Sequence, residues 1–492
     1  MSVTDAAPTT LDTATLARFV RDGYLTVQTS LPPSFHVDVC RRAGAILDRE
    51  GNWGNNMLPR LPELRHVLAD AAVHGALSSL LGPTYVLHPH RYCHRNEPGS
   101  TAQRLHKDTR EFSGDRHLRH PRPRWLIAFY YPHDVTAEMG PTAIVPGSQY
   151  YLEPPQAGAS PEMLVQVPGG SVTIVHFGIW HRATSNRSNQ PRYMFKFQFA
   201  RMDEPLPGAE PDPVAWDTDA GQAPHPGLWS SVLGWLQGNG QVACEQVAES
   251  ALDTLAAKDV YTRRAAADAF AVAGADTDTI PRLAQALSDV DEPVRLNAAQ
   301  ALAAAGKAAL PVLDAALRAP DGPARRHAAH ALSEMGVAAV ELLVERAHDA
   351  DEQVAINAID ALGNMGAAAE PAEPALRAAL KADNPWLRRH ATEALGILGS
   401  SARSAVADLA DALCDEQPYV RFNAATALAR IGPSASEATP ALVKALEDPD
   451  RYTRGWAVQA LQRIGTPEAL NALVDHLMLA RWCPTTRTDD RY

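Results

Sequence analysis

Residues 294–306 read VRLNAAQALAAAG, and similar phrases recur as VAINAIDALGNMG at 354–366 and VRFNAATALARIG at 420–432. Each phrase ends in a glycine, and an arginine lies eleven residues before that glycine in six of seven units. The seven glycines follow one another at intervals of 30 to 33 residues: Gly274, Gly306, Gly336, Gly366, Gly399, Gly432 and Gly465. A fixed period of this length is typical of a solenoid of repeated helical units.

Each unit contains the pattern of two helices. Apolar residues in the quoted phrases recur at steps of three and four, which predicts a helix with one buried face, and the glycine suits a left-handed C-cap. A second helix follows, such as LPVLDAALR at 310–318. An aspartate usually precedes each arginine by four to six residues, and we expect these aspartates and arginines to pair between stacked units rather than to act in catalysis.

These units resemble HEAT repeats of the short bacterial kind over roughly 250–480. The resemblance implies an extended surface that binds a protein partner or packs on the rest of the chain. Phycobilin-lyase-like proteins carry similar units, so bilin-lyase chemistry is an alternative that the repeat type alone does not specify.

Composition and charge narrow the remaining possibilities. The 492 residues are 46% hydrophobic and 21% charged, which is typical of a globular protein of several domains. The net charge is −12, and the solenoid carries most of it, which argues against nucleic-acid or anionic-membrane binding. No apolar run is long enough for a transmembrane helix, no secretory signal is evident, and five scattered cysteines form no CxxC motif. We therefore expect a cytoplasmic protein without a membrane or nucleic-acid partner.

The predicted organisation has five parts: a catalytic domain at 10–205, a Pro/Gly/Asp-rich linker at 206–226, bridging or capping helices at 227–250, the solenoid at 251–480, and a tail at 481–492. The first part begins with helical patterns at 13–22, 35–50 and 63–82. Short strands separated by Gly/Pro turns follow from residue 85, and they predict a sandwich or barrel.

A set of metal-binding side chains lies among these strands. His106 and Asp108 are two residues apart, so in an extended segment they share a face and can reach one metal. His181 is the best third ligand. Two histidines and one carboxylate occupy one face of an octahedral metal and leave three open positions, as in non-haem Fe(II) oxygenases.

In such oxygenases a bidentate 2-oxo acid fills two of the open metal positions and O₂ takes the third. The carboxylate of 2-oxoglutarate that lies away from the metal then needs a cationic side chain, and arginine suits this clamp better than lysine because it can bind a carboxylate with two parallel hydrogen bonds. If Thr184 pairs with Pro191 in a hairpin, Arg192 lies opposite Ala183, which shares a face with His181. Arg192 is then the clamp. A register slip of one residue would reverse this result.

The ordered set of HKD at 106–108, MGPTAIVPGS at 139–148, and His181 followed by Arg192 resembles the phytanoyl-CoA dioxygenase family over about 15–203. The resemblance implies a double-stranded β-helix of the jelly-roll or cupin kind with flanking helices, and Fe(II), 2-oxoglutarate and O₂ as cofactor, cosubstrate and oxidant. It implies metal-ligand and catalytic roles for His106, Asp108 and His181, and cosubstrate-binding roles for Arg192, Gln103, Thr142, Phe129 and Tyr92. Many members carry serine where this chain has Ala183.

We therefore predict a multidomain Fe(II)/2-oxoglutarate-dependent dioxygenase that hydroxylates, or otherwise oxidises, an unactivated C–H bond of a small organic metabolite. The basic segment that includes Arg110, Arg116 and Arg119 would admit an anionic substrate, or it is a solvated loop. The alternative is a peptide hydroxylase or an interaction scaffold whose solenoid recruits a protein. The other interpretations of His106, Asp108 and His181 are unrelated surface or structural residues, or a zinc or nickel cupin-like site.

Overall fold

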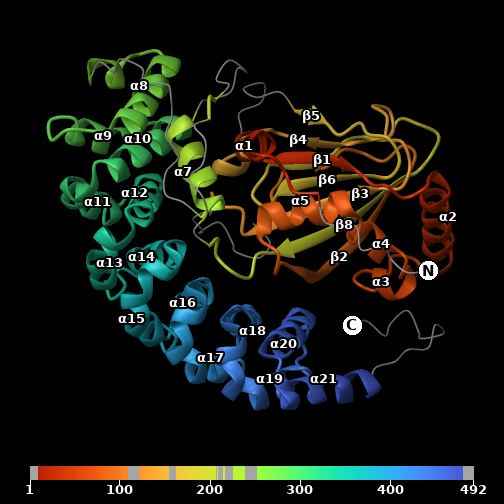
Figure 1. Ribbon diagram of the computed structural model, residues 1–492. Helices are drawn as coiled ribbons and strands as arrows, with labels where there is room; N and C mark the ends of the chain where they lie inside the picture. Colours follow the sequence, from red (N-terminus) through yellow and green to blue (C-terminus); the bar gives the residue numbers. More distant parts are fainter. Residues whose placement is uncertain are drawn as a thin grey trace. The chain divides into compact units, whose positions relative to one another are not determined.

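The computed structural model describes residues 9–108, 121–154, 162–206, 208, 214–216, 225–238 and 252–479. They form two compact units (Figure 1). The first comprises the described residues up to Asp203 together with Leu479, and the second spans Glu204–Met478. Most of the predicted linker, the end of the predicted bridging segment and the predicted tail lie outside the described residues.

The first unit is built on two antiparallel sheets. The larger sheet has the order β1-β6-β3-β8-β2 and the smaller has the order β5-β4-β7. The strands are β1 Tyr24–Gln28, β2 Val86–Asn96, β3 Trp125–Tyr131, β4 Thr142–Ile144, β5 Met163–Leu164, β6 Ser171–His176, β7 His181–Ala183 and β8 Arg192–Ala200. This two-sheet architecture confirms the predicted double-stranded β-helix.

The core of this unit lies between the two sheets. Strand β8 sends alternate side chains into this core and to the outer face of the larger sheet. Successive side chains of a strand point to opposite sides. Met194 points inward and packs with residues of both sheets, including Ile127 of the larger sheet and Ile144 of the smaller. Tyr193 points the other way, toward helix α2 (Pro33–Glu50). All nine residues of β8 are buried, including the polar residues Arg192, Lys196 and Gln198 on the face that Met194 shares.

Helices cover the outer face of the larger sheet. They are α1 Thr13–Asp22, α2 Pro33–Glu50, α3 Met57–Arg60, α4 Leu64–Leu68 and α5 Ala71–Leu81. His36 of α2 makes a 2.7 Å hydrogen bond to the hydroxyl of Tyr130 on β3. Gly44 allows α2 to approach closely, because a Cβ atom there would lie 2.9 Å from the hydroxyl of Tyr193.

The single helix expected over 63–82 is instead two helices, α4 and α5. Asp70 lies at the break, where its carboxylate accepts hydrogen bonds from the Ala72 amide and from the amide and hydroxyl of Ser30. An aspartate that satisfies free amides at a helix start favours a new N-cap over a continuous helix. The break ties α5 to the segment after β1.

The second unit is the predicted helical repeat (Figure 1). Its helices are α7 Pro226–Leu236, α8 Val260–Ala273, α9 Ile280–Ala286, α10 Glu292–Ala304, α11 Leu310–Leu317, α12 Gly322–Glu334, α13 Val340–Arg346, α14 Glu352–Asn364, α15 Glu373–Ala379, α16 Pro385–Leu398, α17 Val406–Ala412, α18 Pro418–Ile431, α19 Thr439–Ala445, α20 Arg451–Ile464 and α21 Pro467–Leu479. The seven repeat glycines all have positive φ. Only Gly465 is a left-handed C-cap as predicted, because Gly274, Gly399 and Gly432 cap their helices with ψ outside the αL region. In the three other units the C-cap is the residue before the glycine. At five of the seven glycines a 3₁₀ turn leads into the second helix: Gly306–Ala309, Gly336–Ala339, Gly366–Ala372, Gly399–Ala405 and Gly432–Ala438.

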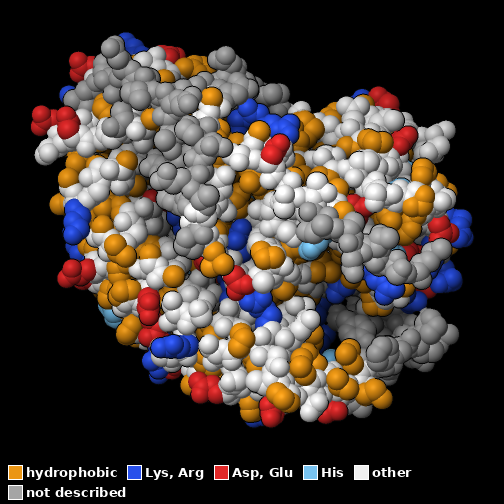
Figure 2. All heavy atoms as spheres, viewed as in Figure 1, with side chains coloured by type: hydrophobic (Ala, Val, Ile, Leu, Met, Phe, Trp, Pro, Cys, Tyr) orange, Lys and Arg blue, Asp and Glu red, His pale blue; other side chains and the backbone are white. Residues whose placement is uncertain are grey.

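The aspartates and arginines of neighbouring units form ion pairs, as predicted. Arg388 contacts Asp415 at 2.6 Å, and Arg421 contacts Asp448 at 2.7 Å. Further pairs are Arg263–Asp289 and Arg325–Asp351. On the face drawn in Figure 2, acidic and basic side chains of the helical unit lie among one another. The repeat arginine is therefore structural.

None of the helices in the described ranges is both long enough and apolar enough to cross a membrane.

Candidate metal centre

The segment that contains His106 is held to the smaller sheet by backbone hydrogen bonds. The amide of His106 donates to the carbonyl of His181, and the amide of His181 donates back, both at 3.0 Å. The Gln103 amide donates to the Ala183 carbonyl at 2.9 Å. These bonds extend the sheet beyond β7 and place the two histidines directly opposite each other on neighbouring extended segments.

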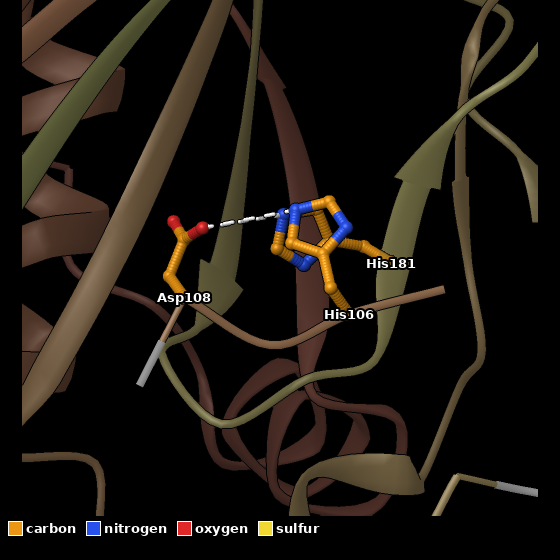
Figure 3. A group of neighbouring side chains, drawn as sticks. All are labelled: His106, Asp108 and His181. Atoms are coloured by element: carbon orange, nitrogen blue, oxygen red, sulfur yellow. Dashed lines mark ion pairs between the residues drawn. The ribbon is translucent and has the colours of Figure 1, made fainter. Parts of the chain in front are cut away.

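The three predicted metal ligands meet in one cluster (Figure 3). The rings of His106 and His181 lie 4.6 Å apart, and Oδ1 of Asp108 is 3.9 Å from Nε2 of each histidine. One donor atom from each residue lies within 4.8 Å of the other two. Three donors at this separation can share one ion, and within the described residues no other group of this kind is found.

Burial and charge fix the ionisation of this cluster. Burial lowers the pKa of His181 to about 4, so its imidazole is neutral at pH 7 and can offer a lone pair. Burial alone would raise the pKa of Asp108, but the Lys196 ammonium and the neighbouring imidazoles outweigh it and hold that pKa below its ordinary value. At neutral pH the cluster therefore presents a carboxylate and a neutral His181, as a metal site requires.

The orientation of the histidines is supported from behind. Nδ1 of His106 contacts the carbonyl of Arg104 at 2.9 Å, and Nδ1 of His181 contacts the carbonyl of Ile179 at 3.2 Å. In each case a proton on Nδ1 leaves Nε2 free on the side that faces Asp108. The side chain of His106 is 37% exposed, whereas that of His181 is 7% exposed, so the cluster is open on the His106 side.

Arg192, the predicted clamp, opens β8 and is 1% exposed. Its Nε donates to the carbonyl of Gly140 at 3.2 Å, while its Nη1 is buried and has no hydrogen-bond partner among the described residues. A buried cationic nitrogen without a partner is costly unless an anion joins it. Gly140 is required at this position, because a Cβ atom there would lie 2.7 Å from the Thr184 carbonyl.

The predicted hairpin from β7 to β8 is wrong, although Arg192 faces the interior. β7 pairs with β4 and the His106 segment, while β8 pairs with β2 and β3 in the other sheet. The SNRSNQ connection crosses between the sheets. Arg192 points inward because it shares the face of Met194, a core residue of the space between the sheets.

The four other predicted cosubstrate contacts lie at different depths. Phe129 on β3 is buried, with its ring 5.8 Å from that of His181. Thr142 on β4 is buried and accepts a 2.9 Å hydrogen bond from the hydroxyl of Tyr131. Tyr92 on β2 is half-buried, and Asn52 donates to its hydroxyl at 2.5 Å. Gln103 is exposed, and its side-chain oxygen accepts from the Ala183 amide at 3.1 Å.

Two further polar groups in this interior were not identified from the sequence. Lys196 lies four residues after Arg192 on the same face of β8, and its Nζ is 2.9 Å from Oδ2 of Asp108. His94 on β2 has a pKa lowered to about 3 by burial and by the cations Lys196 and Arg192. In the strand RYMFKFQFA, Lys196 is four positions after Arg192 and therefore lies on the same face. This spacing could have identified the lysine from the sequence.

Family models match both parts of the chain. Residues 19–194 match the model of the phytanoyl-CoA dioxygenase (PhyH) family, and residues 248–336, 340–417 and 406–481 match HEAT repeats. The chain is similar to SnoK, a non-heme alpha-ketoglutarate-dependent carbocyclase from nogalamycin biosynthesis, at 21% identity over 40% of this chain and 88% of that chain, with a TM-score of 0.34. It is also similar to EctD from S. alaskensis, whose structure holds 2-oxoglutarate and 5-hydroxyectoine, at 18% identity over 40% of this chain and 78% of that chain, with a TM-score of 0.34.

The two-sheet fold, the His–Asp–His cluster and the family match place residues 19–194 in the class of non-haem iron- and 2-oxoglutarate-dependent dioxygenases. Residues 19–194 form a domain of the phytanoyl-CoA dioxygenase family, and HEAT repeats follow it in the same chain. Its cofactor is Fe(II), its cosubstrate is 2-oxoglutarate and its oxidant is O₂.

The residues present fit that cofactor and cosubstrate. Two imidazoles and one carboxylate form a donor set suited to Fe(II), and they leave room for other ligands because they come from one side. The buried and unpartnered Nη1 of Arg192 suits a cosubstrate carboxylate.

Proposed function

We propose that His106, Asp108 and His181 bind Fe(II), and that Arg192 binds the distal carboxylate of 2-oxoglutarate. The observation that carries this proposal is the presence of both parts of the site in the interior of one unit. The three donors lie within 4.8 Å of one another, and Arg192 keeps a buried nitrogen available on the inward face of β8. The bound iron supplies activation of O₂.

The chain's own residues bind and orient the reactants. The two histidines and Asp108 occupy one side of the metal, and Arg192 fixes the end of 2-oxoglutarate remote from the metal by a charge-assisted hydrogen bond. Phe129 and Met194 supply apolar walls that exclude water from the reacting groups. In the overall reaction one oxygen atom of O₂ enters succinate with release of CO₂, and the other replaces hydrogen as a hydroxyl group on the substrate.

We further propose that the substrate is a small organic molecule. Asp108 and His181 are buried, and the cluster is open at the partly exposed His106, an arrangement that suits a small ligand entering between the sheets. We also propose that this substrate can be anionic, because the sequence places a basic segment directly after Asp108. Its arginines at positions 110, 116 and 119 lie outside the described residues.

Labelled oxygen tests this function. Protein loaded with Fe(II) and 2-oxoglutarate without oxygen is exposed to ¹⁸O₂ with a panel of small organic acids, alcohols and amines. We expect one label in succinate and one in a hydroxylated panel member. Succinate formation that no small molecule stimulates, together with label in a peptide library, would replace this substrate class with a peptide.

The second candidate is a peptide hydroxylase or scaffold, and the HEAT repeats favour it. Stacked helical repeats provide the extended surfaces by which such proteins bind partners. We propose that the solenoid binds a protein partner or packs against another part of the protein. A full-length protein that hydroxylates a small molecule equally well with and without peptide partners would leave the solenoid a role separate from catalysis.

A further inference from the structure

A second buried cation lies beside the metal-binding cluster. Lys196 is 9% exposed and lies on β8, four residues after Arg192 and on the same inward face. Its ammonium donates to Oδ2 of Asp108 at 2.9 Å. A charge-assisted bond of this length in a buried setting is strong and directional.

This contact divides the two oxygens of Asp108 between two neighbours. Oδ2 belongs to Lys196, whereas Oδ1 is the oxygen that lies 3.9 Å from Nε2 of both His106 and His181. Lys196 therefore holds the carboxylate so that one oxygen faces the position a metal would take. The carboxylate is 7% exposed, so solvent contributes little to its orientation.

The lysine also changes the charge of the site. Its positive charge offsets the negative charge of Asp108, so the three metal ligands and Lys196 together carry no net charge when the histidines are neutral. Arg192 adds one positive charge to the same interior. A divalent metal alone then meets net repulsion, while an anion such as 2-oxoglutarate meets two cations and the metal.

We propose that Lys196 is a positioning and charge-balancing residue that directs Oδ1 of Asp108 to the metal, weakens binding of metal alone and strengthens binding of the anionic cosubstrate. This inference rests on the proposed ligand set. On this account, the site binds the metal more favourably when 2-oxoglutarate is also bound than when the metal binds alone.

Another buried lysine shows what a purely structural role looks like. Lys107 is 1% exposed and donates to the carbonyls of Ser148 and Tyr151. It therefore holds a backbone turn, although it lies between the two ligands in sequence. Lys196 differs because its partner is a metal-ligand carboxylate.

Two binding constants of the full-length protein test the proposal, with Co(II) as the probe metal. The first is the Kd for Co(II) without 2-oxoglutarate, and the second is the Kd of the Co(II)-loaded protein for 2-oxoglutarate, both by calorimetry. In Lys196→Gln, which keeps a hydrogen-bond donor but no charge, we expect Co(II) to bind at least about tenfold more tightly and 2-oxoglutarate at least about tenfold more weakly. Lys196→Arg should restore both constants.

The opposite signs separate this role from a structural one. A packing defect would weaken both constants or leave both unchanged, and either result in Lys196→Gln would overturn the proposal. The matched control is Gln198→Met, a buried polar residue on the same face of β8, which should leave both constants within about twofold. An equal effect of Gln198→Met would also overturn it. If the glutamine variant does not fold, Lys196→Met, which loses both the charge and the donor, is tested on the second constant alone: 2-oxoglutarate should bind at least about tenfold more weakly, and an unchanged constant would overturn the proposal.

Asp108→Ala in the same titrations distinguishes failure of this inference from failure of the proposed ligand set. Wild-type Co(II) affinity in Asp108→Ala would reject the ligand set itself. Loss of Co(II) binding in Asp108→Ala, with Lys196 variants unchanged, would reject only the role of Lys196.

Discussion

The buried guanidinium of Arg192 allows the sharpest test among single residues. Arg192→Met removes a charge-assisted contact to the 2-oxoglutarate carboxylate in a desolvated interior, where such contacts are worth about 2–5 kcal/mol. We expect the Kd for 2-oxoglutarate to rise at least about thirtyfold while the Kd for Co(II) changes little. Calorimetric titration of each ligand measures both effects.

Strand β7, which precedes β8 in the sequence but lies in the other sheet, provides the control for that variant. Arg182 follows His181, but it points outward and forms a 2.7 Å ion pair with Glu162 that is partly exposed. Arg182→Met should leave the 2-oxoglutarate affinity within about twofold. An Arg192→Met protein that binds 2-oxoglutarate as tightly as wild type would remove Arg192 from the site.

The sequence allowed most of this centre to be predicted at the residue level. The two-residue spacing of His106 and Asp108 holds in any extended segment, so no knowledge of strand pairing was needed. The role of Lys196 was missed because its significance depends on which carboxylate lies opposite β8. That contact joins residues 88 positions apart and follows from the tertiary fold.

Among the elements, the junction of α7 and α8 contains an unusual acid. Asp268 on α8 is half-buried, its carboxyl accepts a hydrogen bond from the backbone of Gly227, and its buried Oδ1 has no partner among the described residues. Burial raises the pKa of Asp268 from 3.8 to about 7. Between about pH 4 and pH 7 the unfolded chain loses this proton while the folded protein keeps it, so stability falls as pH rises through that window.

Replacing this acid with an uncharged side chain should remove that pH dependence. We expect Asp268→Asn to be more stable than wild type at pH 8, by up to about 4 kcal/mol, and the difference to shrink toward pH 5 as Asp268 becomes protonated. Urea unfolding at pH 5, 6, 7 and 8 measures it. A difference that is constant across this range would mean that Asp268 ionises normally in the folded protein.

The ion pairs between repeat units make a second prediction at this scale. Arg421 binds both oxygens of Asp448 and also donates to the Asp415 carbonyl. Arg421→Ala leaves a nearly buried carboxylate without its partner and should cost about 2 kcal/mol in the free energy of unfolding. Chemical denaturation should show this loss, and the double variant with Asp448→Asn should recover part of it.

An exposed arginine in a neighbouring repeat is the comparison for this pair. Arg403 lies in the 3₁₀ turn after α16, and Arg403→Ala should change the free energy of unfolding by less than about 0.5 kcal/mol. Equal losses from Arg403→Ala and Arg421→Ala would show that the ion pair contributes nothing specific.

The elements differ in how far the sequence predicts them. The repeat helices and the positive φ of the glycines that follow them derive from a local pattern that seven units repeat, and the structure confirms both. The pairing of β7 and β8 was predicted wrongly because a turn-rich connection between two strands looks the same whether it closes a hairpin or crosses between sheets. The break before α5 depends on a contact of Asp70 with Ser30, forty residues away.

At the scale of the whole molecule, one chain joins an oxygenase domain and a helical repeat that differ in their chemistry. The negative charge lies mainly in the solenoid, where many acidic side chains are paired with arginine. The oxygenase unit instead buries two cations, Arg192 and Lys196, on the inward face of β8, and Lys196 contacts the carboxylate of Asp108. The overall charge of −12 is therefore a poor guide to the charge of the substrate.

The central claim is that His106, Asp108 and His181 hold the iron that oxidises 2-oxoglutarate. The most direct measurement is succinate formed by the full-length protein, loaded with Fe(II) and 2-oxoglutarate without oxygen and then exposed to O₂. Wild type and Asp38→Ala, an exposed acid in the same unit, should form succinate in an Fe(II)-dependent manner, and Asp108→Ala should fall to the level without Fe(II). Equal succinate from wild type and Asp108→Ala would contradict the claim.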